Sequence, residues 1–179
     1  LNTPERTVVR PGYAIPFFYY QEFLSLNPAI ESAVARLLRD PMMRRPTRVE
    51  YRAQKLGELQ NLMLSNETVM NQELINDLLD KFDSERTPSG EPSKMKLRSS
   101  TNAEDLPNFN GAGLYTSESY KPMKNGSEKT REKKEESLKE ALRTVWASIW
   151  NLRAFDERTY FQIPHGEVMM GMQVNRSFG

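Results

Sequence analysis

Apolar side chains in the first half of the chain recur at three- and four-residue spacings, which is the spacing of a helix with one buried face. This pattern predicts helices over residues 18–26, 30–38, 48–66 and 67–82. We expect the second helix to start at Asn27-Pro28, because proline is favoured in the first turn of a helix. Residues 8–17 combine two prolines and a glycine with apolar residues, which favours a short strand or an extended lead-in.

The pattern changes after residues 84–93, which contain two prolines, a glycine and three serines and are typical of a linker. Alternation of basic and apolar residues from Lys94 to Leu97 predicts a strand that ends at Arg98. Residues 117–137 are highly charged, and we expect them to be mobile at their start. A long helix is expected from about residue 129, with apolar positions at Leu138, Leu142, Val145, Trp146, Ile149, Trp150 and Leu152.

A final strand is predicted over residues 167–178, where Val168, Met170, Met172 and Val174 alternate with smaller or polar residues. Together these elements predict an α+β fold. In it, a mostly helical first part (1–83) and the linker (84–93) precede a strand-loop-helix-strand second half (94–179). A chain of 179 residues is long enough for one domain, or for a large piece of one.

Composition limits the chemistry that the chain can carry. The 25 Lys and Arg residues balance 24 Asp and Glu residues, so any binding site for an anion must be local, and we expect no nucleic-acid partner. The absence of cysteine excludes disulfides, thiolate metal sites and cysteine catalysis, and a single histidine excludes an all-histidine zinc site. No segment approaches the about 18 apolar residues of a membrane span, and residues 1–13 lack the apolar core of a signal peptide, so we expect a cytoplasmic protein without a membrane partner.

Candidate chemistry gathers between Lys94 and Ser117, where an arginine and a pair of glycines follow the predicted strand. The planar fork of Arg98 could hold two phosphate oxygens at once. Gly111 and Gly113 would let backbone N–H groups approach an anion closely. From the residues alone, a surface arginine followed by an ordinary turn explains the same pattern.

Other candidates in this stretch have simple structural explanations. Glu104-Asp105 could be metal ligands or an acid and base pair, but we favour an acidic helical turn that is capped by Asn102 or Thr101. Ser99-Ser100 could supply a nucleophile, but no histidine lies nearby in the sequence, and a structural hydrogen-bonding role is favoured.

Three features outside this stretch also have simple structural explanations. His165 could accept a phosphoryl group, but its place between a helix and a strand favours a turn residue. Trp146 and Trp150 lie four residues apart on one helix face, which favours the core. Residues 129–136 mix both charge signs and are predicted to be a solvated helix start, with an interaction surface as the alternative.

Residues 98–117, RSSTNAEDLPNFNGAGLYTS, closely resemble the arginine and glycine-rich-loop motif of the pyruvate phosphate dikinase and phosphoenolpyruvate synthase family, approximately RSSAxxEDxPxxSFAGxxxT. Residues 8–24 resemble the family's VPxGFxIT…AYxxFL segment, residues 145–158 its VWAS…RAxxYR helix, and residues 169–178 its MAVVVQRMV strand. These motifs keep their order along the chain. The resemblance implies the N-terminal ATP-grasp nucleotide-binding domain of that family.

On the phosphate side of the nucleotide, the resemblance implies three contacts. Arg98 matches the arginine that contacts phosphate, and Gly113 matches a glycine of the loop that closes over the phosphates. Ser117 stands where the family has a threonine and keeps its hydroxyl.

On the adenine side, Asn175 matches a hinge glutamine, and backbone groups of Arg176 and Ser177 would pair with the base edge. The shorter asparagine is a departure from the family pattern. The ATP-binding residues implied by the resemblance are therefore Arg98, Gly111, Ala112, Gly113, Ser117, Asn175, Arg176 and Ser177.

The resemblance further implies that residues 1–179 are a fragment of one ATP-grasp domain in a larger phosphotransferase. The ligands of Mg²⁺, a phosphate-gripping lysine, a swivelling domain with a phosphorylatable histidine and an acceptor-substrate domain are expected outside this chain. No catalytic residue and no metal ligand are predicted within it, so the fragment alone should be inactive. The alternative is a non-catalytic regulatory or interaction module with residues 118–136 as its contact surface.

Overall fold

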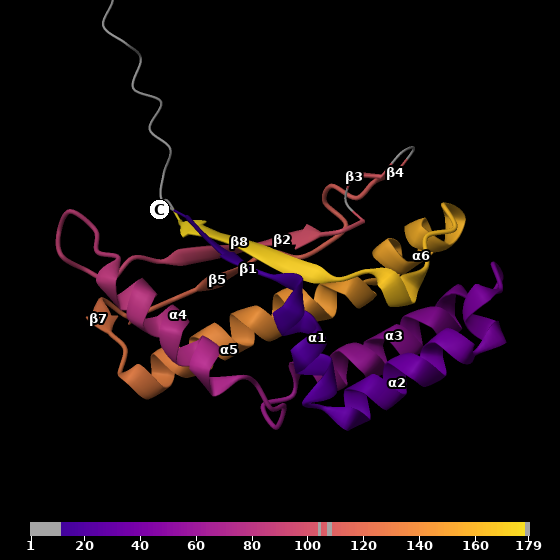
Figure 1. The fold of residues 1–179 in the computed structure, drawn as a ribbon, viewed down its shortest axis with the longest axis horizontal. Coiled ribbons are helices and arrows are strands. Elements are labelled where there is room, and N and C mark those ends of the chain that lie inside the picture. The colour runs from indigo at the N-terminus through magenta and orange to yellow at the C-terminus, as the bar shows by residue number, and fades with distance from the viewer. Residues whose placement is uncertain (1–11, 104, 107–108, 178–179) are drawn as a thin grey trace, which may run out of the picture.

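The computed structural model describes residues 12–103, 105–106 and 109–177 (Figure 1). The described residues form helices that pack against a central antiparallel sheet, so the predicted α+β class is confirmed. The helices are α1 (Phe17–Ser25), α2 (Pro28–Arg39), α3 (Val49–Leu64), α4 (Gln72–Ser84), α5 (Arg131–Ala147) and α6 (Leu152–Tyr160). The strands are β1 (Gly12–Ile15), β2 (Met95–Thr101), β3 (Asp105–Leu106), β4 (Phe109–Asn110), β5 (Glu118–Tyr120), β6 (Met123–Lys124), β7 (Ser127–Glu128) and β8 (Met170–Arg176).

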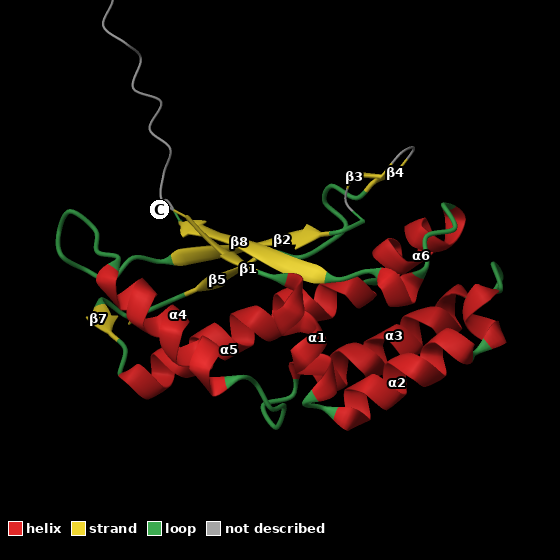
Figure 2. Cartoon of the chain, in the orientation of Figure 1, coloured by secondary structure: helices red, strands yellow, loops and turns green. Residues whose placement is uncertain are grey.

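The main sheet has the strand order β1-β8-β2-β5, with every neighbouring pair antiparallel. Side chains of β2 and β8 alternate between a buried face and an exposed face, as the period-two pattern predicted. The buried face carries Met95, Leu97, Met170, Met172 and Val174. Helices α1 and α5 lie against this face, and no described helix covers the other face (Figure 2).

Helix α5 forms the centre of the core, because it contacts the sheet on one side and α3 and α4 on the other. Trp146 and Trp150 are buried, each with 2% of its surface exposed, which confirms their predicted core position. The Trp146 ring stacks on Phe23 of α1 with ring centroids 4.9 Å apart. The α2–α3 pair extends the helical layer beyond α5 (Figure 1).

The predicted helices of the first half are confirmed, with one shifted boundary. Helix α2 begins at Pro28, directly after Asn27, as expected. Helix α4 begins at Gln72 rather than near Glu67, because the Asn71 side chain accepts a hydrogen bond from the Leu74 backbone N–H at 3.0 Å and caps the helix there.

The long helix expected from residue 129 is in fact broken. Helix α5 ends at Ala147, a short 3-10 turn spans Ser148–Trp150, and α6 follows. The Ser148 hydroxyl donates to the Val145 carbonyl at 2.6 Å, so it takes over an acceptor at the end of the helix. The apolar periodicity continues through the 3-10 turn, which explains why the sequence pattern predicted a single helix.

The charged segment after Ser117 contains strands that the pattern did not predict. Strand β5 pairs with β2, and its residues Ser119 and Tyr120 are buried. Strands β6 and β7 form a hairpin whose two-residue turn is Asn125-Gly126, with φ values of 51° and 77°. An Asn-Gly pair favours this turn, and it was the signal in the sequence for a hairpin.

Residues 85–93 form a closed turn between α4 and β2. The Ser93 N–H donates to the Glu85 carbonyl at 2.8 Å, and Arg86 forms an isolated β-bridge with Pro92. Glu85 in this segment also contacts Tyr13 of β1 and Arg176 of β8. The predicted division of the chain into a helical part, a linker and a second half stays a prediction.

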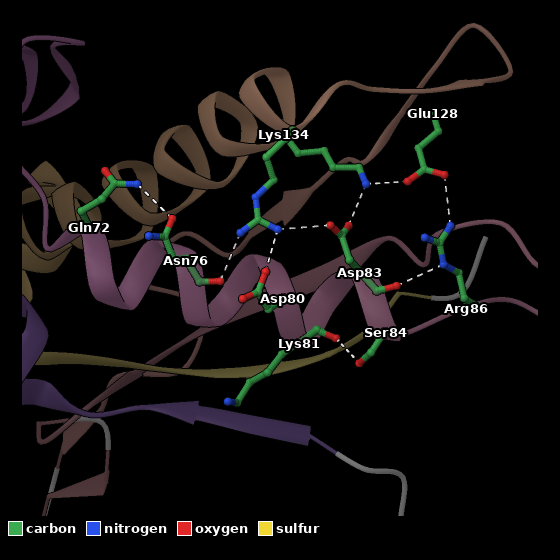
Figure 3. Close-up of polar contacts among 10 residues, drawn as sticks. Gln72, Asn76, Asp80, Lys81, Asp83, Ser84, Arg86, Glu128 and Lys134 are labelled. Atoms are coloured by element: carbon green, nitrogen blue, oxygen red, sulfur yellow. Dashed lines mark hydrogen bonds and ion pairs between the residues drawn. The ribbon is translucent and has the colours of Figure 1, made fainter.

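An ionic cluster joins α4, α5 and the β6–β7 hairpin (Figure 3). Lys134, with 5% of its surface exposed, lies between Asp83 and Glu128, and its Nζ is 2.7 Å from Asp83 Oδ1. Arg131 pairs with Asp80 at 2.7 Å, and Arg86 pairs with Glu128 at 3.1 Å. The start of α5 is therefore only partly solvated, since one of its lysines is buried in this cluster.

Candidate functional site

The exposed face of the main sheet carries the first part of the candidate site. Lys94, Lys96 and Arg98 alternate along β2 and share this face, and Arg98 is exposed. In the register of β2 and β8, Arg98 lies opposite Gln173, and Lys96 lies opposite Asn175. Arg98 and Asn175 are therefore diagonal neighbours on one face, a relation that brings long side chains within reach of each other. Two residues that the sequence assigned to opposite ends of a nucleotide thus come together.

Lys96 and Gln173 were not predicted as candidate site residues. Both share the exposed face with Arg98. The alternating basic residues of β2 were a signal for Lys96. Gln173 could be found only from the strand register, which links distant parts of the chain.

Ser117 lies beside β2, immediately before β5. Its carbonyl oxygen accepts from Lys96 Nζ at 3.1 Å, and its hydroxyl oxygen accepts from the Ser99 backbone N–H at 3.3 Å. These bonds hold the end of the 111–117 segment next to Arg98. The Ser117 hydroxyl can still donate its proton.

The glycine loop is a tight turn. The Leu114 N–H donates to the Gly111 carbonyl at 3.2 Å, and Gly113 has φ of +77°, a left-handed conformation that favours glycine. The Ala112 N–H donates to Asn110 Oδ1 at 2.9 Å. Ala112 and Gly113 are exposed, whereas Gly111 is buried. The tip of the loop therefore faces solvent on a fixed base.

Two side chains from the region of α6 hold this base: Asn151 directly precedes the helix, and Arg158 lies in it. Asn151 Nδ2 donates to the Leu114 carbonyl at 3.2 Å, and an Arg158 guanidinium nitrogen donates to the Tyr115 hydroxyl at 3.3 Å. Leu114 and Tyr115 are buried. Sequence reasoning missed both anchors, although they lie in the 145–158 stretch that carries one of the quoted motifs.

On the hinge side, the structure separates the three predicted residues. Asn175 faces the exposed side of the sheet, beside Gly12 of β1. The Arg176 guanidinium instead pairs with Glu85, with Nε 2.6 Å from the carboxylate. The Ser177 N–H donates to the Lys94 carbonyl at 2.8 Å, so this amide is already engaged within the protein.

Glu85 connects the hinge strand to β1. It accepts from the Tyr13 hydroxyl at 2.8 Å while it pairs with Arg176. The hydrogen bond from Tyr13 and the ion pair with Arg176 hold the pKa of Glu85 below its usual value. The carboxylate is therefore kept ionised, and it fixes the ends of β1 and β8 relative to each other.

The prediction of an acidic helical turn after Thr101 is wrong. Asp105–Leu106 is a strand, and Asn102 does not cap a helix. Its Nδ2 donates to the Glu167 carbonyl at 2.8 Å, and its Oδ1 accepts from the Met169 N–H at 2.9 Å. Glu104 and the side chain of Asp105 lie outside the described residues.

His165 lies in a 3-10 turn, His165–Glu167, as its predicted connector role requires. Its ring stacks flat on Phe155 with centroids 3.9 Å apart, and Arg158 Nε donates to its Nδ1 at 3.1 Å. Its Nε2 lies 3.1 Å from the Thr159 hydroxyl. Burial, followed by the charges of Arg158 and Arg44, lowers the pKa of His165 to about 4. With both nitrogens engaged, the ring is poorly suited to accept a phosphoryl group.

Within residues 12–103, 105–106 and 109–177, no group of three or more His, Asp or Glu side chains is arranged to hold a metal ion. In the same part of the chain, no helix has both the length and the apolar character that a bilayer crossing needs.

Comparison with known proteins identifies the family of this chain. The family model described as "Pyruvate phosphate dikinase, AMP/ATP-binding domain" matches residues 3–178. A phosphoenolpyruvate synthase of Aeropyrum pernix is 33% identical over 86 residues, which are 48% of this chain. The matched segment is only 9% of that relative's length. Since the family model covers nearly the whole sequence, the chain belongs to the pyruvate phosphate dikinase AMP/ATP-binding domain family.

Proposed function

We propose that this chain is the ATP-binding part of a dikinase-type phosphotransferase, which passes a phosphoryl group from ATP through a histidine in another domain. The observation that carries the proposal is the register of β2 and β8, since it sets Arg98 and Asn175 on the same uncovered face of the sheet. Family membership supports the nucleotide, and the phosphoenolpyruvate synthase relative supports the reaction class.

In this proposal, each part of the face has a role. Arg98 holds phosphate oxygens through its planar fork, and Lys96 adds a second positive charge beside it. The Gly111–Gly113 turn lies over the phosphates with its exposed tip. Asn175 faces the adenine from the neighbouring strand. Phosphoryl transfer requires positioning and charge neutralisation more than covalent chemistry, and these residues can supply both.

The remaining chemistry is assigned to parts outside this chain. Mg²⁺ would neutralise phosphate charge, and we propose that its ligands belong to other segments of the full-length protein. The phosphorylated histidine and the acceptor site are assigned to separate domains, and the acceptor itself (pyruvate, a glucan, an antibiotic or another) is chosen there. The cytoplasmic location stays a prediction from the sequence.

The test is binding of ATP and of adenosine by the full-length protein and its Arg98→Ala variant. Loss of a charged hydrogen bond to phosphate should weaken ATP binding about 10- to 100-fold and leave adenosine binding unchanged. Arg153→Ala is the control, because Arg153 is an exposed arginine on α6. Unchanged ATP affinity and turnover in Arg98→Ala would contradict the proposal.

ATP binding, together with detection of a phosphorylated histidine after incubation of the full-length protein with ATP, distinguishes the alternative function. A full-length protein that binds ATP but forms no phosphorylated histidine would be a nucleotide-binding regulatory module. Failure of the wild-type protein to bind ATP at all would favour an interaction module, for which residues 118–136 are the candidate surface.

A further inference from the structure

Arg158 is the most deeply buried charged residue of the described chain, with 0% of its surface exposed. None of the ion pairs among the described residues includes it, so its charge is not balanced by a carboxylate there. Burying an unbalanced charge is costly unless its N–H groups are hydrogen-bonded. The position therefore calls for a specific role.

Three neutral acceptors surround the guanidinium. Nε donates to His165 Nδ1 at 3.1 Å, and the two terminal nitrogens donate to the Ile149 carbonyl at 2.7 Å and the Tyr115 hydroxyl at 3.3 Å. Burial lowers the pKa of Arg158, but an arginine side chain stays charged in proteins. Arg158 is thus a buried cation in which each of the three guanidinium nitrogens donates a hydrogen bond.

The three acceptors differ in where they come from. Ile149 and His165 belong to the segments directly before and after α6, so bonds to them tie the helix to its own neighbourhood. Tyr115 lies 43 residues earlier in the chain and belongs to the base of the glycine loop. Only this bond connects the arginine to the candidate site.

We infer that Arg158 is a positioning residue for the Gly111–Gly113 loop, which it holds in place through the Tyr115 hydroxyl. The inference rests on the proposed function, because the loop matters only if it meets the phosphates of ATP. A loop that is already held in its binding geometry loses less conformational freedom when the nucleotide binds. Asn151, which donates to the Leu114 carbonyl, acts beside it on the same loop base.

Tyr115→Phe in the full-length protein tests this inference directly. The substitution removes the acceptor oxygen and keeps the buried ring. We expect ATP affinity to fall about five- to tenfold and adenosine affinity to stay unchanged, because a loop released from Arg158 must be ordered when it meets the phosphates, and adenosine has none. Tyr160→Phe is the matched control, since Tyr160 is 80% exposed, and its ATP affinity should equal that of the wild type.

Arg158→Lys is a second variant. It keeps the charge but cannot reach three acceptors at once, so it should show the same selective loss of ATP affinity. If this variant does not fold, Tyr115→Phe decides the question by itself. An equal loss of ATP and adenosine affinity in Tyr115→Phe would show a general structural role and overturn the inference.

The outcomes also separate this inference from the proposed function. Weaker ATP binding in Arg98→Ala together with wild-type ATP binding in Tyr115→Phe would overturn the role of Arg158 and leave the proposed function intact. A wild-type protein without ATP binding would overturn both.

Discussion

The side chain of Asn175 lies across Gly12 on the neighbouring strand, so close that a Cβ on Gly12 would stand 2.8 Å from Asn175 Nδ2. The same Cβ would be 3.1 Å from the Val174 carbonyl oxygen. Side chains in proteins do not approach a Cβ that closely, so only glycine leaves room for this position of Asn175. The first strand thereby sets the orientation of the residue that we assign to adenine.

Gly12→Ala should therefore displace the Asn175 amide. We expect the affinities for ATP and adenosine to fall together, by about three- to tenfold, since the loss is that of one neutral hydrogen bond to the base. Nucleotide titration of the full-length protein measures both. Gly57→Ala is the control, because a Cβ there meets nothing within 4 Å on α3, and the variant should gain about 0.5–1 kcal/mol in stability. Unaltered adenosine binding in Gly12→Ala would speak against the role of Asn175.

Gly113→Ala probes the loop conformation. Its φ of +77° strains any residue with a Cβ, so the unfolding free energy should fall by about 1 kcal/mol. Gly90→Ala is matched to it, since Gly90 has φ of +84° and equally open surroundings, but it lies in the 85–93 turn. Both variants should lose similar stability in thermal unfolding, whereas only Gly113→Ala should weaken ATP binding. Equal ATP affinities in the two variants would refute a phosphate role for the loop.

Lys134→Met tests the ionic cluster. It would leave the carboxylates of Asp83 and Glu128 without their shared partner, and because both are partly exposed we expect a loss of about 1–2 kcal/mol in unfolding free energy. Lys133→Met, at the neighbouring exposed position, should change it by less than about 0.5 kcal/mol. Denaturant unfolding of both variants measures the difference, and equal values would show that the cluster contributes nothing.

His165 should make stability depend on pH. Its pKa is about 4 in the folded protein and about 6.5 in the unfolded protein. As the pH falls, His165 is therefore protonated in the unfolded state before it is protonated in the folded state. The stability contributed by neutral His165 is therefore fully present above about pH 6.5 and is lost as the pH falls toward 4. Because a single group takes up at most one proton, the slope due to His165 cannot exceed about 1.4 kcal/mol per pH unit.

The variant His165→Gln isolates this contribution. The difference in melting temperature between wild type and variant should shrink as the pH is lowered from 7 to 5. Thermal unfolding of both proteins at a series of pH values measures this difference. A constant difference between pH 7 and pH 5 would show that His165 does not cause the pH dependence of stability.

Much of the local structure follows from the sequence. The three- and four-residue apolar periodicity of α1–α4 and the alternation in β2 and β8 depend only on residues close together in the chain, and these elements were confirmed. The same locality explains the misses. Asn71 caps α4 with its side chain, and the short strand β5 exists because β2 lies beside it, neither of which periodicity can reveal.

The sequence by itself determined which chemistry this protein can carry: a basic strand that ends at Arg98, a glycine turn and a family motif. Only the tertiary structure decided how these parts meet. The β2–β8 register sets Arg98 near Asn175, 77 residues along the chain, and the buried Arg158 reaches Tyr115 across 43 residues. Such contacts depend on how strands pair and helices pack, and these are properties of distant residues acting together rather than of any local pattern.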